Sequence, residues 1–156
     1  MLASNLDKKK FEKICIIDTN VKIGSKIKVS GGAKCNITNE LVTSNNYLGD
    51  REFVKELLEK FSKKELLAFL NKNGVFPKIN PKIVKGTYFC NSSQDVIDMF
   101  TKITTHVKKY LNTTVLDINF DKHYKIKTDS KLIEAKKEEV ASGGLSYPIL
   151  GASSLA

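Results

Sequence analysis

A short apolar run that ends in an acidic residue constrains the fold of this chain more than any other feature. Residues 13–18 read K-I-C-I-I-D, so four consecutive apolar side chains are followed directly by Asp18. A continuous apolar run, unlike an alternating one, is typical of a strand that is buried on both faces in a parallel sheet. We therefore expect an α/β domain in which Asp18 lies at the end of a parallel strand.

Helical periodicity accounts for much of the remaining chain. A pattern over residues 2–11 begins without a capping residue, whereas Asp50 can cap a helix whose apolar residues recur at helical spacing. Ser62 and Glu65 form a capping-box pattern for the next helix. The clearest helix opens at Ser92. Its apolar face is predicted to consist of Val96, Phe100, Ile103, Val107 and Tyr110.

Two alternating runs predict a β-hairpin near the end of the chain. Residues 115–120 and 124–128 alternate between apolar and polar side chains and flank a turn at residues 121–123. Residues 19–39 are rich in Gly, Ser, Asn and Lys and indicate an extended ordered loop. Residues 78–90 are expected to form an irregular stretch, although their composition says little. A strand, a long excursion, a helix and further strands are again typical of an α/β domain.

Length and cysteine usage indicate one domain from a reducing compartment. With 156 residues the chain is long enough for one domain with a core and too short for two. Cys15, Cys35 and Cys90 are scattered and odd in number, which argues against a disulfide framework and against a metal site. No apolar run is long enough to span a bilayer, and no signal-peptide pattern is present. We expect a cytoplasmic protein with no membrane partner.

The net charge of +9 leaves a second interpretation open. Clustered basic residues attract polyanions, so a lysine-rich, non-catalytic module that binds RNA or another polyanion is the alternative. Arg51 is the only arginine, however, although arginine is favoured for bidentate contacts to phosphates and bases. The lysines are also interleaved with Asp and Glu along the whole chain. We interpret most of the charge as a solvated surface and nucleic acid as the less favoured partner.

Residues 24–39 carry the densest set of groups that can bind a cofactor. Ser30, Gly31 and Gly32 allow backbone N–H groups to approach an anion or a flat ring closely. No Gly-Lys-Ser/Thr follows the glycines, so the segment is not a Walker A loop. A surface loop with two turn glycines is the purely structural alternative. The same segment supplies cations and directional hydrogen-bonding groups, namely Lys26, Lys28, Lys34, Asn36, Thr38 and Asn39.

Asp18 also has two interpretations. In a dinucleotide-binding βαβ unit, an acid at the end of a strand accepts hydrogen bonds from a ribose 2′-hydroxyl at the carboxyl edge of the sheet. An Asp at the end of a strand is often simply a turn former. Taken alone, Asp18 is weak evidence for a ribose contact, and the turn-former role is favoured unless other features agree.

Several ordered motifs together resemble a known family. Residues 24–39 read G-x-K-x-x-x-S-G-G-x-K-C-N-x-T-N, which is similar to the G-R-K-x-x-x-S-G-G-G-R-C-N-x-T-N signature of the YhiN/BaiN-like flavoproteins. Residues 73–77 resemble the G-R-V-F-P region of that family, and residues 141–154 resemble its A-T-G-G-x-S-x-P-x-x-G-S-x-G segment. The helix from Ser93 onward is similar in placement to the crossover into the family's next strand. The resemblance covers nearly the whole chain.

The resemblance implies a fold and a domain organisation. The family consists of FAD-dependent proteins of the two-dinucleotide-binding-domain superfamily, many of them NAD(P)/FAD-dependent oxidoreductases. It implies a partial Rossmann-like FAD-binding domain that lacks its first strand and glycine-rich turn and contains a helical excursion and a β-hairpin. Residues 1–44 would be the Rossmann portion with a flavin-facing loop, residues 45–90 the helical excursion, and residues 91–156 the crossover helix, strands and Ser-Gly-Gly segment.

The resemblance also implies roles for individual residues. Asp18 would bind the adenosine ribose, although the family usually has Glu there, and Val115 would present its backbone near the adenine. Lys26 and Ser30–Asn36 would lie along the pyrophosphate and the flavin, and Ser142–Gly144 would pack close to the dinucleotide. The expected cofactor-binding residues are Asp18, Lys26, Ser30, Gly31, Gly32, Lys34, Cys35, Asn36, Thr38, Val115, Ser142, Gly143 and Gly144.

Two departures from the family pattern change the chemistry of the loop. Ser25 and Lys34 stand where the family usually has Arg, and they remove guanidinium contacts that serine or lysine cannot reproduce. Cys35 is either a thiol activated by nearby lysines or a small packing residue, and we favour packing. His106 and His123 are solitary and lack the partners of a metal site or an acid/base relay. No catalytic residue is predicted.

The sequence therefore predicts part of an FAD-dependent oxidoreductase that contributes to FAD binding for electron or hydride transfer. In such enzymes the flavin carries out the chemistry and the protein supplies position and electrostatics. The expected partners are FAD, an unidentified small-molecule substrate and NAD(P)H as a candidate electron donor. The chain alone is expected to be inactive and to bind FAD weakly, because it lacks the glycine turn and helix N-terminus that face the pyrophosphate.

Overall fold

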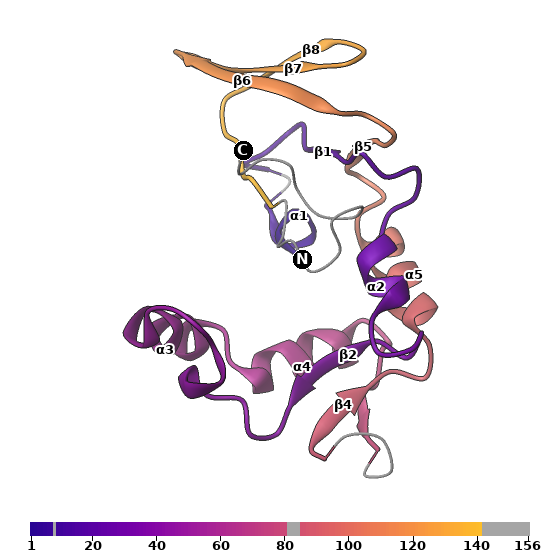
Figure 1. The fold of residues 1–156 in the computed structure, drawn as a ribbon. Helices are drawn as coiled ribbons and strands as arrows, with labels where there is room; N and C mark the ends of the chain where they lie inside the picture. The colour runs from indigo at the N-terminus through magenta and orange to yellow at the C-terminus, as the bar shows by residue number, and fades with distance from the viewer. Residues whose placement is uncertain (8, 81–84, 142–156) are drawn as a thin grey trace. The chain divides into compact units, whose positions relative to one another are not determined.

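The computed structural model describes residues 1–7, 9–80 and 85–141, and Figure 1 shows their elements. They belong to two compact units. One is formed by Met1–Ser25 together with Thr104–Ala156, and the other by Lys26–Ile103. Helices, one parallel strand pair and two antiparallel sheets occur together, so the expected α/β class is confirmed.

The first unit contains the predicted parallel strand. β1 (Cys15–Ile17) pairs in parallel with β5 (Lys108–Tyr110). The expectation that β1 is buried on both faces is wrong for the described residues, because Cys15 is exposed and Ile16 and Ile17 are only half-buried. Among the described residues, β1 and β5 form a two-stranded sheet. β1 therefore has a neighbouring strand on one side only.

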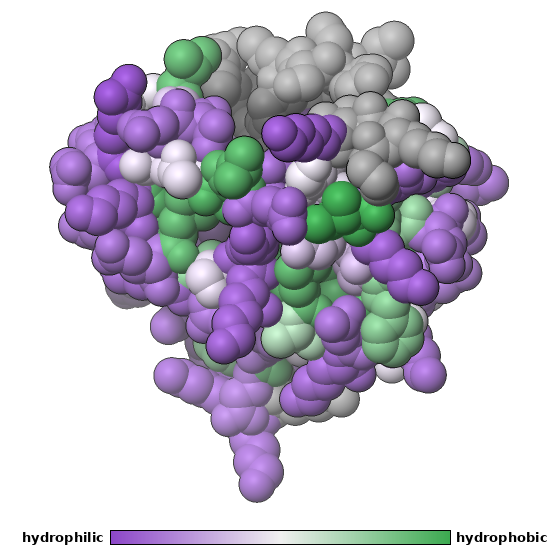
Figure 2. Space-filling model, turned by 90° about the horizontal axis from the view of Figure 1, so that it is seen from below, coloured by the Kyte–Doolittle hydropathy of each residue, from purple (hydrophilic) through white to green (hydrophobic). Residues whose placement is uncertain are grey.

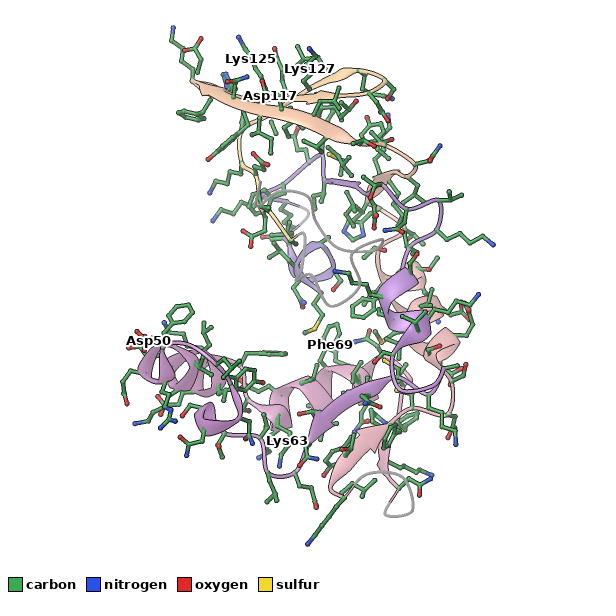
Figure 3. All side chains as sticks on the ribbon, viewed as in Figure 1. Asp50, Lys63, Phe69, Asp117, Lys125 and Lys127 are labelled. Atoms are coloured by element: carbon green, nitrogen blue, oxygen red, sulfur yellow. The ribbon has the colours of Figure 1, made fainter. Side chains whose placement is uncertain are left out.

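The predicted hairpin is also confirmed and gains a third strand. β6 (Val115–Asp121), β7 (His123–Thr128) and β8 (Leu132–Ala135) form an antiparallel sheet in the order β6-β7-β8 (Figure 1). Asp117 lies opposite Lys127 in the register, and Figure 3 shows both on the same side of the sheet as Lys125. Because side chains alternate along a strand, this side of the sheet is polar.

The helix predicted over residues 2–11 is much shorter than expected. α1 (Leu2–Asn5) ends where Leu6 adopts an extended backbone with ψ of 132°. The N–H groups of Lys10 and Phe11 then bond to the carbonyl of Asp7 at 3.0 and 2.9 Å, which forms a local turn. The prediction was wrong beyond Asn5 because a few apolar residues at helical spacing do not distinguish a helix from a turn followed by an extended chain.

The helical excursion lies in the second unit and follows its capping signals. η1 (Ser44–Asn46) precedes α3 (Arg51–Lys60), and α4 (Lys63–Lys72) follows. The Asp50 carboxylate accepts hydrogen bonds from the N–H groups of Glu52 and Phe53 at 3.0 and 3.1 Å. These bonds satisfy donors that have no partner inside the helix.

The helix predicted from Ser92 ends earlier than its apolar pattern. α5 (Ser93–Ile103) is followed by a turn in which the N–H of Val107 bonds to the carbonyl of Thr104 at 3.1 Å. Tyr110 belongs to β5 and not to the helix. The helical assignment of Val107 and Tyr110 was therefore wrong, because the backbone groups of residues 108–110 pair with β1 instead of continuing the helix.

Two stretches that were predicted to be irregular contain regular structure. The expected loop over residues 19–39 includes α2 (Ser25–Val29) and β2 (Asn36–Asn39). The stretch over residues 78–90 includes β3 (Lys78–Ile79) and β4 (Thr87–Phe89). The three strands form an antiparallel sheet in the order β2-β4-β3. Pairing between segments distant in the sequence leaves little local signal, so these strands were missed.

The core of the second unit lies between these strands and the helices. Leu70 of α4 is only 2% exposed, and its neighbour Phe69 lies with its ring 6.2 Å from the ring of Phe100 of α5. The buried cluster consists of Cys35, Leu70, Val75, Cys90, Val96 and Met99. Because Cys35 follows the diglycine and Cys90 follows β4, this core holds the diglycine loop against the sheet.

One face of the molecule is largely hydrophilic where the described residues form it. Figure 2 shows one face on which hydrophilic residues predominate and smaller hydrophobic areas lie among them. Phe53 and Phe76 are among the large apolar side chains that remain exposed, at 60% and 62%. Within the described ranges, no helix combines the length and the hydrophobicity that a membrane crossing requires.

Leu70→Ala tests the assignment of the core. We expect the free energy of unfolding to fall by about 2–5 kcal/mol, because the change leaves a cavity among packed side chains. Urea unfolding followed by far-UV circular dichroism measures the effect. Leu48→Ala is the matched control, since that leucine is fully exposed. Equal losses in the two variants would contradict the placement of the core around α4.

Glu65→Gln tests the capping box of α4 through its pH dependence. The N–H and hydroxyl of Ser62 donate to one carboxylate oxygen of Glu65 at 2.6 and 2.9 Å, and these bonds lower its pKa. A lowered folded-state pKa means that the stabilisation is present above the ordinary carboxyl range and disappears as the pH falls through the lowered value. Urea unfolding across acidic pH should show the advantage of the wild type over Glu65→Gln shrinking as the pH falls. An advantage that is independent of pH would contradict this.

Candidate cofactor-binding site

Asp18 lies at the carboxyl end of β1 and closes a tight turn. Its Oδ1 accepts hydrogen bonds from the backbone N–H and the side-chain amide of Asn20, both at 2.8 Å. Its N–H donates to the carbonyl of Tyr110 in β5 at 2.9 Å. Oδ2 accepts no hydrogen bond from the described parts of the chain, so Asp18 acts as a turn former with one oxygen available to a ligand.

The same edge of the parallel pair includes the chain that leads into β6. The N–H of Thr113 donates to the carbonyl of Asp18 at 3.1 Å, and the N–H of Asn112 donates to the carbonyl of Asn20 at 3.0 Å. Val115 begins β6 two residues after Thr113. The first unit therefore places Asp18 close to the backbone that reaches Val115, at the sheet edge where open α/β sheets bind ligands.

The diglycine loop adopts an unusual backbone conformation. Gly31, Gly32 and Ala33 have φ angles of 58°, 60° and 68°, and Cys35 has a φ of 54°. Left-handed values are natural for glycine but cost an alanine or a cysteine free energy, so surrounding contacts must hold the loop in this form.

The two glycines are required for different reasons. A Cβ at Gly31 would collide with the side-chain oxygen of Asn36 and lie 2.9 Å from its backbone nitrogen. A Cβ at Gly32 would have no described atom within 4 Å. Gly31 thus lets the loop close onto Asn36, whereas Gly32 borders open space.

Three consecutive backbone N–H groups in the diglycine loop indicate a site for an anion. Gly31, Gly32 and Ala33 donate no backbone hydrogen bond to any residue in the ranges that the structure describes. Successive unbonded N–H groups in a turn form a concavity that binds anions such as phosphate. The loop therefore fits a phosphate-bearing group without the helix N-terminus of a Walker A motif.

Contacts from β4 and α5 hold this loop in place. The N–H of Ser93 donates to the carbonyl of Ala33 at 2.7 Å, and the N–H of Cys90 donates to the carbonyl of Lys34 at 2.9 Å. Ser93 is buried, and its hydroxyl lies 3.4 Å from the carbonyl of Lys28. Sequence reasoning assigned no such role to Cys90 or Ser93, because backbone anchoring depends on distant segments and leaves no side-chain pattern.

The polar residues of the loop divide into structural and exposed groups. The Asn39 amide donates to the carbonyl of Lys85 at 3.0 Å and to the hydroxyl of Thr87 at 2.9 Å, so it joins β2 to β4. Asn36 and Lys34 are exposed, and Lys26 and Thr38 are half-buried. Lys34 makes no side-chain hydrogen bond or ion pair within the described residues. The loop thus retains exposed groups for a ligand after its internal bonds are made.

Cys35 and Cys90 face the core. They are 6% and 4% exposed, and burial raises the pKa of both thiols, that of Cys90 to about 11. Thiols react mainly as thiolates, so burial and a raised pKa both disfavour reaction of these thiols at neutral pH. This agrees with the interpretation that Cys35 packs and does not act as a nucleophile.

No alternative site for a metal or for acid/base chemistry emerges from the described ranges. They contain no group of three or more His, Cys, Asp or Glu residues that could hold a metal ion. Nε2 of His106 is buried and has no hydrogen-bond partner in this part of the chain. A histidine without an orienting partner lacks the geometry of a proton relay.

The predicted cofactor-binding residues fall in both units. Asp18 and Val115 belong to the first unit, and the residues from Lys26 to Thr38 belong to the second. Ser142, Gly143 and Gly144 lie outside the described residues. The groups present in each unit fit parts of FAD: a carboxylate oxygen for a ribose hydroxyl in one, and unbonded N–H groups for a diphosphate in the other.

Comparison with known proteins connects this geometry to a family. The model described as the HI0933-like protein Rossmann domain matches residues 1–156. A protein of Escherichia coli named ribosomal RNA dihydrouridine synthase is 32% identical over 98% of this chain and 39% of its own length. A protein of the same name from Haemophilus influenzae is 29% identical over 91% of the chain and 37% of its own length.

A third relative bears a different name. The 3-dehydro-bile acid delta(4,6)-reductase of Clostridium scindens is 27% identical over 89% of this chain and 34% of its own length. The chain therefore spans less than two fifths of the length of these relatives. The match to the family model over all 156 residues confirms the resemblance drawn from the sequence motifs and the Rossmann-like fold: this chain belongs to the HI0933-like family of FAD-dependent oxidoreductases, within its Rossmann domain.

Proposed function

We propose that this chain supplies part of the FAD-binding site of a flavin-dependent reductase. In this proposal the N–H groups of Gly31, Gly32 and Ala33 receive the FAD diphosphate, and Asp18 accepts a hydrogen bond from the adenosine ribose. The observation that carries the proposal is the run of three consecutive N–H groups without a partner in the described residues. Backbone donors of this kind favour an anion that is approached closely by the main chain.

The surroundings of the loop support a phosphate. Lys34 is exposed next to the three N–H groups, and Lys28 is exposed on α2 just before them. No described atom lies within 4 Å of the position that a Cβ would take at Gly32, which leaves room for a ligand beside the main chain there. Charge and access both favour the diphosphate of a dinucleotide at this position.

The first unit supports a ribose at Asp18. Oδ1 is already engaged by Asn20, whereas Oδ2 accepts no hydrogen bond from the described chain. An ionised carboxylate accepts strong hydrogen bonds from hydroxyl groups. Val115 begins β6 two residues after Thr113, which bonds to the Asp18 carbonyl, and this supports a place for the adenine near that backbone.

The names of the relatives support a reduction as the overall reaction. Dihydrouridine is uridine with two added hydrogens, so the names ribosomal RNA dihydrouridine synthase and delta(4,6)-reductase both describe reductions. When bound, FAD supplies the hydride or electron transfer, and the protein residues hold it and exclude competing reactions. NAD(P)H is the proposed electron donor to the flavin.

RNA is the substrate class that we favour for this reductase. Two of the relatives act, by name, on ribosomal RNA, and the net charge of +9 on this chain supports a polyanionic substrate. In this proposal the positive charge serves to bind the RNA substrate of the reductase. A separate, non-catalytic polyanion-binding module is then not needed to account for the charge.

Gly32→Ala tests the diphosphate position. We expect it to weaken FAD binding, because a methyl group would enter the open space above the three N–H groups. Titration of the 156-residue chain into FAD, followed by flavin fluorescence and extended to high protein concentration, measures the affinity. Gly49→Ala is the matched control, since Gly49 also has a positive φ and open space around its Cβ position. An equal effect of the two changes would contradict the proposed position.

Asp18→Ala tests the ribose contact in the same titration. Loss of a hydrogen bond to a charged group costs about 1.5–3 kcal/mol, which corresponds to a roughly 10- to 150-fold weaker affinity. Asp18→Asn retains the turn to Asn20 through its side-chain oxygen and should lose less. Asp117→Ala is the control, because its carboxylate also bonds only to neighbouring residues in the described chain. If Asp18→Ala and Asp117→Ala bind FAD equally well, the ribose assignment is wrong.

A further inference from the structure

A groove in the second unit adjoins the diglycine loop. Two cavities of about 420 and 280 Å³ share Lys78, Cys90 and Asn91 in their walls. Phe76 lines the first cavity, and Lys34 lines the second. The three shared residues make the two cavities neighbours, and we refer to them together as the groove. Lys34 connects it to the loop proposed to bind FAD.

The charges of the groove are unevenly distributed. Lys34 and Lys78 both line the second cavity, and no carboxylate is among the described residues of its lining. Both lysines are exposed and make no side-chain hydrogen bond or ion pair within the described residues. Asp95 lines only the first cavity. The second cavity therefore favours an anion, and the first offers a carboxylate acceptor to a neutral donor group.

The first cavity also offers an aromatic surface. Phe76 is 62% exposed, which is unusual for a phenylalanine beside a buried core that includes its neighbour Val75. Exposed aromatic rings beside lysines are typical of sites for single-stranded nucleic acid, where bases stack on the rings and cations follow the backbone. Asn91, in the wall shared by both cavities, adds a side-chain donor and acceptor for the edge of a base.

We propose that this groove docks an unpaired nucleotide of an RNA substrate, with its base on Phe76 and its phosphate between Lys34 and Lys78. The proposal rests on the proposed function, since it names where the RNA substrate of the reductase would lie. The position of Lys34 in both the groove and the loop brings a nucleotide bound there next to the segment assigned to FAD. The aromatic surface and the lysine pair each match one chemical part of the nucleotide.

Fluorescence anisotropy with a labelled oligouridylate tests the proposal on the 156-residue chain. Phe76→Ala should weaken binding between about 5-fold and 150-fold, because a stacked base is lost. Lys78→Gln should weaken binding and reduce the salt dependence of the affinity by about 0.7 in log–log slope, since one phosphate contact to a single strand is lost.

Two control variants on α3 match the test residues. Phe53→Ala removes a phenylalanine that is 60% exposed, and Lys55→Gln removes an exposed lysine. Neither residue lines the groove. Both should leave the affinity and the salt slope unchanged. Far-UV circular dichroism checks that all four variants remain folded. Competition with unlabelled uridine monophosphate distinguishes a free nucleotide from a strand: we expect the oligouridylate to bind more tightly.

The outcomes separate this inference from the function on which it rests. If Phe76→Ala and Lys78→Gln bind the oligouridylate as well as their controls do, or if the wild type does not bind it, the groove is not an RNA site. Equal affinity for the monophosphate and the oligouridylate also overturns the proposal. FAD titration of the same variants should be unchanged, since neither residue is assigned to the cofactor. Equal FAD affinity of Gly32→Ala and its control Gly49→Ala would instead contradict the proposed function.

Discussion

The left-handed backbone of the diglycine loop is the constraint on which the rest of the candidate site depends. Gly31, Gly32 and Ala33 turn the chain so that three N–H groups remain without a backbone partner among the described residues. Ala33 and Cys35 adopt this conformation at a cost of roughly 1–3 kcal/mol each. The cost is offset by burial of Cys35 in the core and by the hydrogen bonds from Cys90 and Ser93 to the loop carbonyls.

The support of this loop gives a structural role to the segment between the loop and β5 in the sequence. Leu70 of α4 and Val96 of α5 contribute to the same buried cluster as Cys35. The excursion and the crossover helix therefore serve as a support for the loop, which in turn presents its main chain to a ligand. Asn39 adds to this support because it joins β2 to β4 through its side chain.

The proposed roles use two lysines whose side chains have no partner among the residues that the structure describes. Lys34 and Lys78 make no side-chain hydrogen bond or ion pair within the described residues, although the unit around them is well packed. Lysines in such positions cost little in stability and provide attraction for a polyanion. The high net charge of the chain thus supports the proposed RNA substrate, and that proposal does not require a separate binding module.

The sequence by itself determined the α/β class, the caps at Asp50 and Ser62, the hairpin and the family, because each depends on local patterns or on ordered motifs. It also singled out Asp18 and the diglycine loop, but not their geometry. Only the tertiary structure decided that α5 ends at Ile103, that β3 and β4 form a sheet with β2, and that Ser93 and Cys90 anchor the loop. These features depend on backbone hydrogen bonds between segments distant in the sequence, and backbone pairing leaves no signature in the side chains that a sequence displays.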